Sequence, residues 1–239
     1  LALALAGGLA LGSARAAAFD DAFDDALEDA LGNWRAAVWY TRTGNVGVAA
    51  FEAEEFRAKW TDLARRFAGE PPASHARVAG WREGLARIAA EAERAGVALE
   101  ADDGPGAASA LAAVGRVLAE LRRAAGLVGF SDLVENYRRE IDRLGALIAP
   151  DERLDEARLR ALKDAVGSLI AAVAALGPGS PQRYSDQEPF RVMLQQSQEG
   201  VTLLLTALNR ASPPPSALEI VGLIRVVRSN YNLLFLRYG

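Results

Sequence analysis

The chain has 239 residues, of which 51% are hydrophobic and 24% charged, and its formal net charge is −4. This length and apolar content suffice to bury a sizeable core, as one large domain or two smaller ones, and argue against a disordered chain. The acidic balance argues against nucleic acid as a partner, because phosphate binding needs a basic face. The sequence contains no cysteine, which excludes disulfides, iron–sulfur clusters and covalent c-type haem.

Residues 1–12 form an apolar run, and the SARAAA segment after it resembles a signal-peptide cleavage site of the A-x-A kind. We expect cleavage after Ala16 or Ala18, with a mature chain that begins near Phe19. Because the sequence starts at Leu1 rather than Met, we expect the basic start of this signal to precede it. An uncleaved anchor helix is the alternative, although the run is shorter than the roughly 20 apolar residues that span a bilayer.

The expected signal peptide, residues 1–18, indicates an exported protein. Since the chain has no cysteine, an exported form must rely on its hydrophobic core for stability. The bias toward alanine, arginine and glycine is typical of a GC-rich bacterium. We therefore expect a periplasmic or secreted protein with no stable membrane span after cleavage.

From Phe19 onward, apolar residues recur at the spacing of one helical face, which predicts an all-α fold. The first helix begins in the acidic segment FDDAFDDALEDAL, whose aspartates meet the positive end of the helix dipole. Segments rich in proline, glycine and aspartate interrupt the pattern. The apolar stripes lie at residues 27–38, 46–67, 78–92, 111–121, 130–144, 159–173, 190–208 and 220–234.

The segment from Trp34 to Trp60 is unusually aromatic, and we expect two helices to meet within it at Thr43-Gly44-Asn45. Gly44 fits a helix C-terminus and Asn45 fits the N-cap of the next helix. One long helix is the alternative, because the two apolar stripes keep nearly the same phase. A glycine inside a helix costs roughly 1 kcal/mol, which favours the turn.

An internal duplication is indicated when the chain is compared with itself. The shift that places Phe23 on Phe130 also aligns the SALxxVG segment at 109–115 with the one at 216–222. Matching breaks support a tandem repeat. We therefore expect two duplicated units, residues 19–129 and 130–239, each resembling an antiparallel four-helix bundle with helices of roughly 18 to 24 residues.

The pattern Tyr40-x-x-x-Gly44-Asn45-x-x-x-Ala49 resembles one tetratricopeptide unit, a family whose repeats are about 34 residues long. The resemblance implies a helical hairpin. It does not recur at the period of that family elsewhere in the chain. A helical-hairpin solenoid therefore stands as the alternative architecture.

Trp39, Tyr40 and Arg42 form the first candidate site. Trp34, Phe56 and Trp60 lie on the apolar stripe and are expected in the core, whereas Trp39 and Tyr40 point elsewhere. They either pack against the second unit or, with Arg42, line a cleft for a small acidic ligand whose carboxylate the guanidinium binds. A further alternative buries Arg42 against Glu52, and Asn45 becomes a buried polar candidate if the helix is continuous.

Glu52 and Glu55 share a helix face at i and i+3. Paired carboxylates bind metals in helical bundles, but the di-iron bundles also need Glu-x-x-His pairs, which are absent here. A solvated face is the simpler interpretation, and His75 in the segment EPPASHAR is expected to be an ordinary loop histidine. A cofactor or metal held by Glu52 and Glu55, with His75 or Met193, is the alternative.

The sequence contains no nucleophile elbow, phosphate loop, HExxH, EF-hand or dinucleotide fingerprint, so we expect no enzyme and no cofactor. Arg225, Arg228 and Arg237 are expected to serve the last helix as dipole and carboxylate partners. The leading hypothesis is an exported all-helical binding or accessory protein that recognises a small ligand or partner protein through Trp39, Tyr40, Arg42, Asn45, Glu52 and Glu55. A cofactor- or metal-binding bundle and a structural interaction protein are the alternatives.

Overall fold

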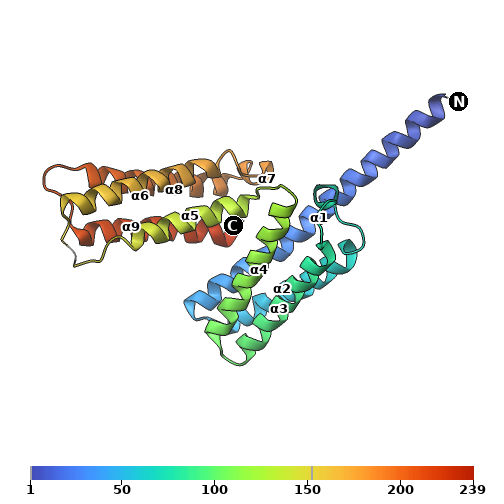
Figure 1. Cartoon of the computed structure of the whole chain (residues 1–239), viewed down its shortest axis with the longest axis horizontal. Helices are drawn as coiled ribbons and strands as arrows, with labels where there is room; N and C mark the ends of the chain where they lie inside the picture. The colour runs from blue at the N-terminus through green and yellow to red at the C-terminus, as the bar shows by residue number, and fades with distance from the viewer. Residues whose placement is uncertain (1, 152) are drawn as a thin grey trace. The chain divides into compact units, whose positions relative to one another are not determined.

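The computed structural model of the chain describes residues 2–151 and 153–239, with side chains from residue 17 onward (Figure 1). All regular structure in this part of the chain is helical, which confirms the all-α prediction. The chain divides into two compact units, residues 1–127 and 128–239. The division expected from the sequence lies between residues 129 and 130.

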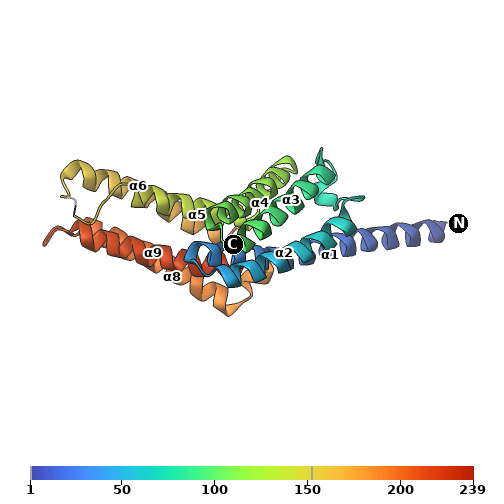
Figure 2. The same ribbon diagram turned by 90° about the horizontal axis from the view of Figure 1, so that it is seen from below.

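The first unit is a four-helix bundle built from α1 (Ala2–Thr43), α2 (Val46–Phe67), α3 (Trp81–Glu100) and α4 (Gly104–Ala124). A 3-10 turn, η1 (Ala73–His75), lies in the connection between α2 and α3. Each helix packs on the next, and α1 also contacts α4, which closes the ring (Figures 1 and 2). A solenoid would leave its first and last helices apart, so the bundle interpretation holds for this unit.

The second unit contains α5 (Phe130–Gly145), α6 (Glu156–Leu176), the short α7 (Gln182–Ser185), α8 (Glu188–Asn209) and α9 (Ala217–Tyr238). Helix α5 packs on α6, α6 on α8, α8 on α9, and α9 on α5. This is the same neighbour order as in the first unit. Because any up-and-down four-helix bundle has that order, the tandem duplication stays a prediction.

The hairpin between α1 and α2 has the expected turn. Gly44 adopts φ 77°, a left-handed conformation that glycine reaches without strain. The Asn45 N–H donates to the Tyr40 carbonyl at 2.9 Å and the Gly44 N–H to the Thr41 carbonyl at 3.3 Å, which is a Schellman motif. The Asn45 side chain then caps α2 by accepting from the Val48 N–H at 3.4 Å. The continuous-helix alternative is therefore wrong.

The core of the first unit is stabilised by buried tryptophans as well as aliphatic side chains. Trp60 Nε1 donates to the Leu85 carbonyl at 3.0 Å, and Trp81 Nε1 donates to the Phe67 carbonyl at 2.8 Å. These bonds join α2 and α3 in both directions. The largest fully buried side chains of this unit are Phe56, Trp60, Leu63, Phe67, Leu85, Ile88 and Leu111.

The core of the second unit contains buried tyrosines instead. Tyr137 is fully buried against the ring of Tyr231, and its hydroxyl donates to the Val227 carbonyl at 3.4 Å. Burial raises the pKa of Tyr137 to about 12, because the phenolate would be poorly solvated there. A cluster of Phe130, Tyr184, Phe190 and Tyr238 closes one end of this bundle.

Two helices differ in length from the expectation. Helix α1 has 42 residues because it begins at Ala2 instead of near Phe19, and alanine and leucine, the strongest helix formers, dominate the added segment. Helix α5 has 16 residues, fewer than expected. Residue 1 and the side chains of residues 2–16, which belong to the expected signal peptide, lie outside the described part of the chain.

None of the helices in residues 2–151 and 153–239 combines the length and the apolar character that a bilayer crossing requires.

Phe56→Ala should lower the free energy of unfolding of the first unit by about 3 to 5 kcal/mol, because it removes a ring with no exposed surface. Phe190→Ala is the matched change in the second unit, where the ring is 1% exposed. Native-state hydrogen exchange should show faster exchange in α1–α4 for the first variant and in α5–α9 for the second. Equal loss of protection in both units for either variant would contradict two separate cores.

Candidate functional site

Trp39 and Arg42 lie together on the outer surface of α1, within the last two turns before its end at Thr43. The two residues are three positions apart, so they share a face. The Arg42 guanidinium carbon is 5.9 Å from the centroid of the Trp39 ring, a cation–π arrangement. Trp39 is half-buried and Arg42 is exposed. The stacked ring therefore restricts the arginine while leaving its N–H groups open to solvent.

The polar groups of this pair are unused within the described part of the chain. Three of the four tryptophans donate their indole N–H to a backbone carbonyl, Trp34 to Leu111 at 3.0 Å and the other two between α2 and α3. Trp39 makes no such bond, and Arg42 forms no ion pair with a described carboxylate. Donors without internal partners, side by side on a rigid helix, are suited to an external acceptor.

Tyr40 and Asn45 have structural roles. Tyr40 is half-buried and packs, together with Val46 and Ala50, on a small alanine-rich core cluster to which all four helices of the unit contribute. Asn45 caps α2. Of the expected site, the structure therefore brings Trp39 and Arg42 together and turns Tyr40 toward the neighbouring helix.

Glu52 is held by α1 and not by Arg42. Asn33 Nδ2 donates to Glu52 Oε2 at 2.6 Å, and about two turns further along α2 Lys59 pairs with Asp29 of α1 at 2.7 Å. The alternative that buried Arg42 against Glu52 is wrong, because the flank of α1 that faces α2 carries Asn33 while Arg42 lies on the outer face.

Glu55 is half-buried and has no hydrogen-bonding partner among the described residues. Glu54 is exposed and pairs with Arg57 at 2.6 Å. That hydrogen bond lowers the pKa of the Glu54 carboxyl. Glu52 is bonded to Asn33 and Glu54 to Arg57, so the three neighbouring carboxylates do not form one cluster, although Glu52 and Glu55 share a helix face.

His75 is not the ordinary loop histidine that the sequence suggested. It is 7% exposed and its ring packs between Phe23 and Trp81, with centroid distances of 5.6 and 5.0 Å. Burial, followed by the charge of Arg122, lowers the pKa of His75, although Asp20 acts in the opposite direction. Helical periodicity could not predict the burial of His75, because η1 is a short turn outside the long helices. Only the tertiary fold places it over the core.

The alternative of a metal or cofactor site through Glu52, Glu55, His75 and Met193 has no support from their surroundings. Among the described residues, no group of three or more histidine, aspartate or glutamate side chains could hold a metal ion. Glu52 is bonded to Asn33, and His75 lies among aromatic rings. Met193 is half-buried on α8 of the second unit.

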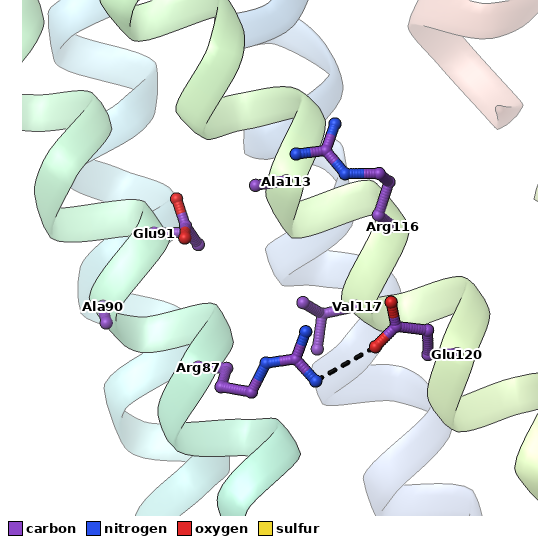
Figure 3. Close-up of a pocket in the computed structure, with 7 residues that line it drawn as sticks. All are labelled: Arg87, Ala90, Glu91, Ala113, Arg116, Val117 and Glu120. Atoms are coloured by element: carbon purple, nitrogen blue, oxygen red, sulfur yellow. Dashed lines mark hydrogen bonds and ion pairs between the residues drawn. The ribbon is translucent and has the colours of Figure 1, made fainter.

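A groove of about 210 Å³ lies on the outer side of α3 and α4 (Figure 3). Ala90, Ala113 and Val117 contribute small side chains to it. Arg87 crosses from α3 to pair with Glu120 at 3.0 Å. The remaining charged lining residues are Glu91, which pairs with Arg94, and Arg116, which is exposed.

No feature of the sequence indicated this groove. Arg87 with Glu91 and Arg116 with Glu120 are opposite charges at i and i+4, a spacing that also fits ordinary surface pairs within one helix. The actual pairing of Arg87 runs between the helices. Because exposed pairs of this kind contribute at most about 1 kcal/mol, the groove needs no function to explain its charges.

The arginines of the last helix divide into different roles. Arg228 pairs with Asp142 of α5 at 2.7 Å, as expected of a carboxylate partner. The Arg237 guanidinium lies 5.6 Å from the ring of Tyr238. Arg225 is exposed and forms no ion pair in the described part of the chain.

Comparison with known proteins identifies no relative of this chain. No family model, no curated protein and no solved structure matches the chain.

The buried His75 should make the first unit less stable in mild acid. The folded-state pKa lies below the ordinary value of 6.5, so the unfolded chain binds more protons as the pH falls below about 6.5. The free energy of unfolding of the wild type should therefore decrease between about pH 8 and pH 5, the range in which histidine titrates. His75→Phe should reduce this decrease, whatever its effect at neutral pH. Denaturant unfolding at several pH values measures both, and an unchanged pH dependence in the variant would contradict the assignment.

Proposed function

We propose that this chain is an exported all-helical binding or accessory protein whose first hairpin recognises a carboxylate group of an acidic ligand or partner. The observation that carries the proposal is the pair of unused donors, Trp39 Nε1 and the Arg42 guanidinium, on one face of α1. The role is non-catalytic, since the chain has no cysteine and its one histidine is buried among aromatic rings.

The chemistry of the pair favours a carboxylate. A guanidinium offers two parallel N–H groups that match the two oxygens of a carboxylate, and stacking on an indole reduces the side-chain entropy lost on binding. The indole N–H adds a third donor. The overall charge of the chain is −4, so the local positive charge of Arg42, and not the net charge, would orient an acidic partner.

An acidic segment of a partner protein fits this surface better than a small molecule. Small-ligand sites are concave and enclose most of their ligand, whereas Trp39 and Arg42 project from the outer side of a helix. Phe51, on α2 of the same hairpin, is 63% exposed, and aromatic side chains are enriched in protein interfaces.

A synthetic hexaglutamate peptide and free succinate are suitable probes of the two ligand classes. We expect the peptide to change tryptophan fluorescence, because the other three indoles are bonded inside the bundle. Arg42→Ala should weaken peptide binding about 10- to 100-fold, as expected for a charge-assisted hydrogen bond worth roughly 1.5 to 3 kcal/mol. Its thermal stability should change by no more than about 0.5 kcal/mol, because Arg42 is exposed.

Two control variants make this experiment specific. Trp39→Phe should remove the fluorescence response while keeping the fold. Arg82→Ala removes an exposed arginine of α3 and should leave binding unchanged. Equal binding by wild type and Arg42→Ala would overturn the site, and a large loss of stability in Arg42→Ala would show that the residue is structural.

The proposal of export is supported by where α1 begins to pack. Ala17 and Ala18 are exposed, whereas Phe19 and Phe23 pack against the core of the first unit. Cleavage after Ala16 or Ala18 would therefore leave the described core contacts of α1 in place. A periplasmic or secreted location agrees with a stability that rests on cores and not on disulfides.

Expression of the chain with its native N-terminal region should yield a protein that begins at Ala17 or Phe19 and is found in the periplasmic fraction. The A-x-A pattern specifies these two cleavage points. N-terminal sequencing of the purified protein and fractionation measure the outcome. An intact N-terminus in the cytoplasm would contradict the proposal, and a change of Ala16 and Ala18 to bulky residues is the matched control that should block cleavage.

A further inference from the structure

The outer face of α9 carries a second apolar stripe, opposite the one that packs on the core. Leu218, Val226 and Leu233 are 64%, 46% and 49% exposed. They follow one another at eight and seven residues, which places them on one side of a helix. Gly222 and Ser229 occupy the turns between them and are also exposed. A helix that is apolar on both sides is usually covered on both sides.

The neighbouring helix α8 extends this apolar face. Val192 and Leu203 are 42% and 56% exposed. The register between the two helices is known, because Asn230 Nδ2 donates to the Gln196 carbonyl at 2.8 Å and Gly200 lies against Val227. In this antiparallel register Leu203 lies level with the segment 222–226, and Val192 lies level with the last turns of α9.

Two charges on this face lack an internal counter-charge. Arg225 on α9 is exposed and forms no ion pair with a described residue. Glu199 on α8 is exposed and accepts a hydrogen bond from Gln195 Nε2 at 2.7 Å, a neutral donor. The face of α8 and α9 therefore offers one positive and one negative group, each on a different helix.

We propose that a second copy of this chain binds the outer face of α8 and α9, about a two-fold axis that runs parallel to the helices and between them. Such an axis places α9 of one copy on α8 of the other and leaves the position along the helices unchanged. Each contact then occurs twice, as in other two-fold interfaces.

This arrangement makes the exposed groups complementary. The partner's Leu203 lies over the segment from Gly222 to Val226, where a Cβ built on Gly222 has no atom within 4 Å. The partner's Glu199 lies within about one helical turn of Arg225, a distance that a long arginine side chain covers. The large Leu203 side chain of the partner subunit thus meets a position where α9 carries no side chain, and opposite charges meet each other.

The size of the face agrees with a dimer. Helices α8 and α9 each have 22 residues, so each is about 33 Å long, and packed helices lie about 8 to 10 Å apart. Two such helices offer an area on the order of 700 Å², close to the roughly 800 Å² per partner that standard interfaces bury.

Sedimentation equilibrium of the full chain tests the proposal. At micromolar concentrations the wild type should have twice the chain mass of 25.4 kDa. Arg225→Glu and Glu199→Arg should each raise the dimer dissociation constant by at least about tenfold, because like charges then face each other. The double variant that combines both reversals should regain the wild-type constant. Restoration distinguishes a lost contact from a lost fold.

Leu203→Glu should also abolish the dimer, and Ile170→Glu on α6 is its matched control, since that side chain is 39% exposed and lies outside the proposed face. A monomeric wild type would overturn the proposal and leave the face to an unrelated partner. A dimer that tolerates Leu203→Glu would overturn it as well. Failure of the double reversal to restore a dimer that each single reversal had weakened would contradict the two-fold arrangement.

Discussion

The first unit depends on the need of buried indole groups for hydrogen-bond acceptors. Trp34, Trp60 and Trp81 each donate to a backbone carbonyl of another segment, from α1 to α4 and between α2 and α3. A buried donor without a partner costs about 1 to 3 kcal/mol. These three bonds therefore select the rotation and the register of the helices, which apolar contacts alone leave loosely defined.

The second unit contains no tryptophan, and its core uses tyrosine instead. Tyr137 and Tyr231 supply the large buried rings, and Gly200 allows α8 and α9 to approach closely at Val227. Gly200 faces α9, whereas the larger Leu203 of α8 is 56% exposed. The exposed apolar side of this helix pair is the surface that we assign to a second copy.

Both proposed surfaces lie on helix exteriors and use charged groups that form no ion pair with the described residues of the chain. At the hairpin this group is Arg42, which stacks on Trp39, and on the second unit the groups are Arg225 and Glu199. The helices hold their side chains at defined positions, so little ordering is required on binding. The two surfaces lie on different units, and their effects are separable by mutation.

Helical periodicity by itself determined the all-α class, the buried faces and the turn at Gly44, because the 3.6-residue repeat and the cap residues are local properties of the chain. The tandem duplication stays a prediction, since the shared helix order follows from the bundle alone. Only the tertiary structure decided that His75 is buried, that Asn33 donates to Glu52, and that Tyr40 packs on the core cluster while Trp39 stacks with Arg42. The physical reason is that periodicity assigns a residue to a side of its helix, whereas its partner depends on which helix or loop comes to lie against that side.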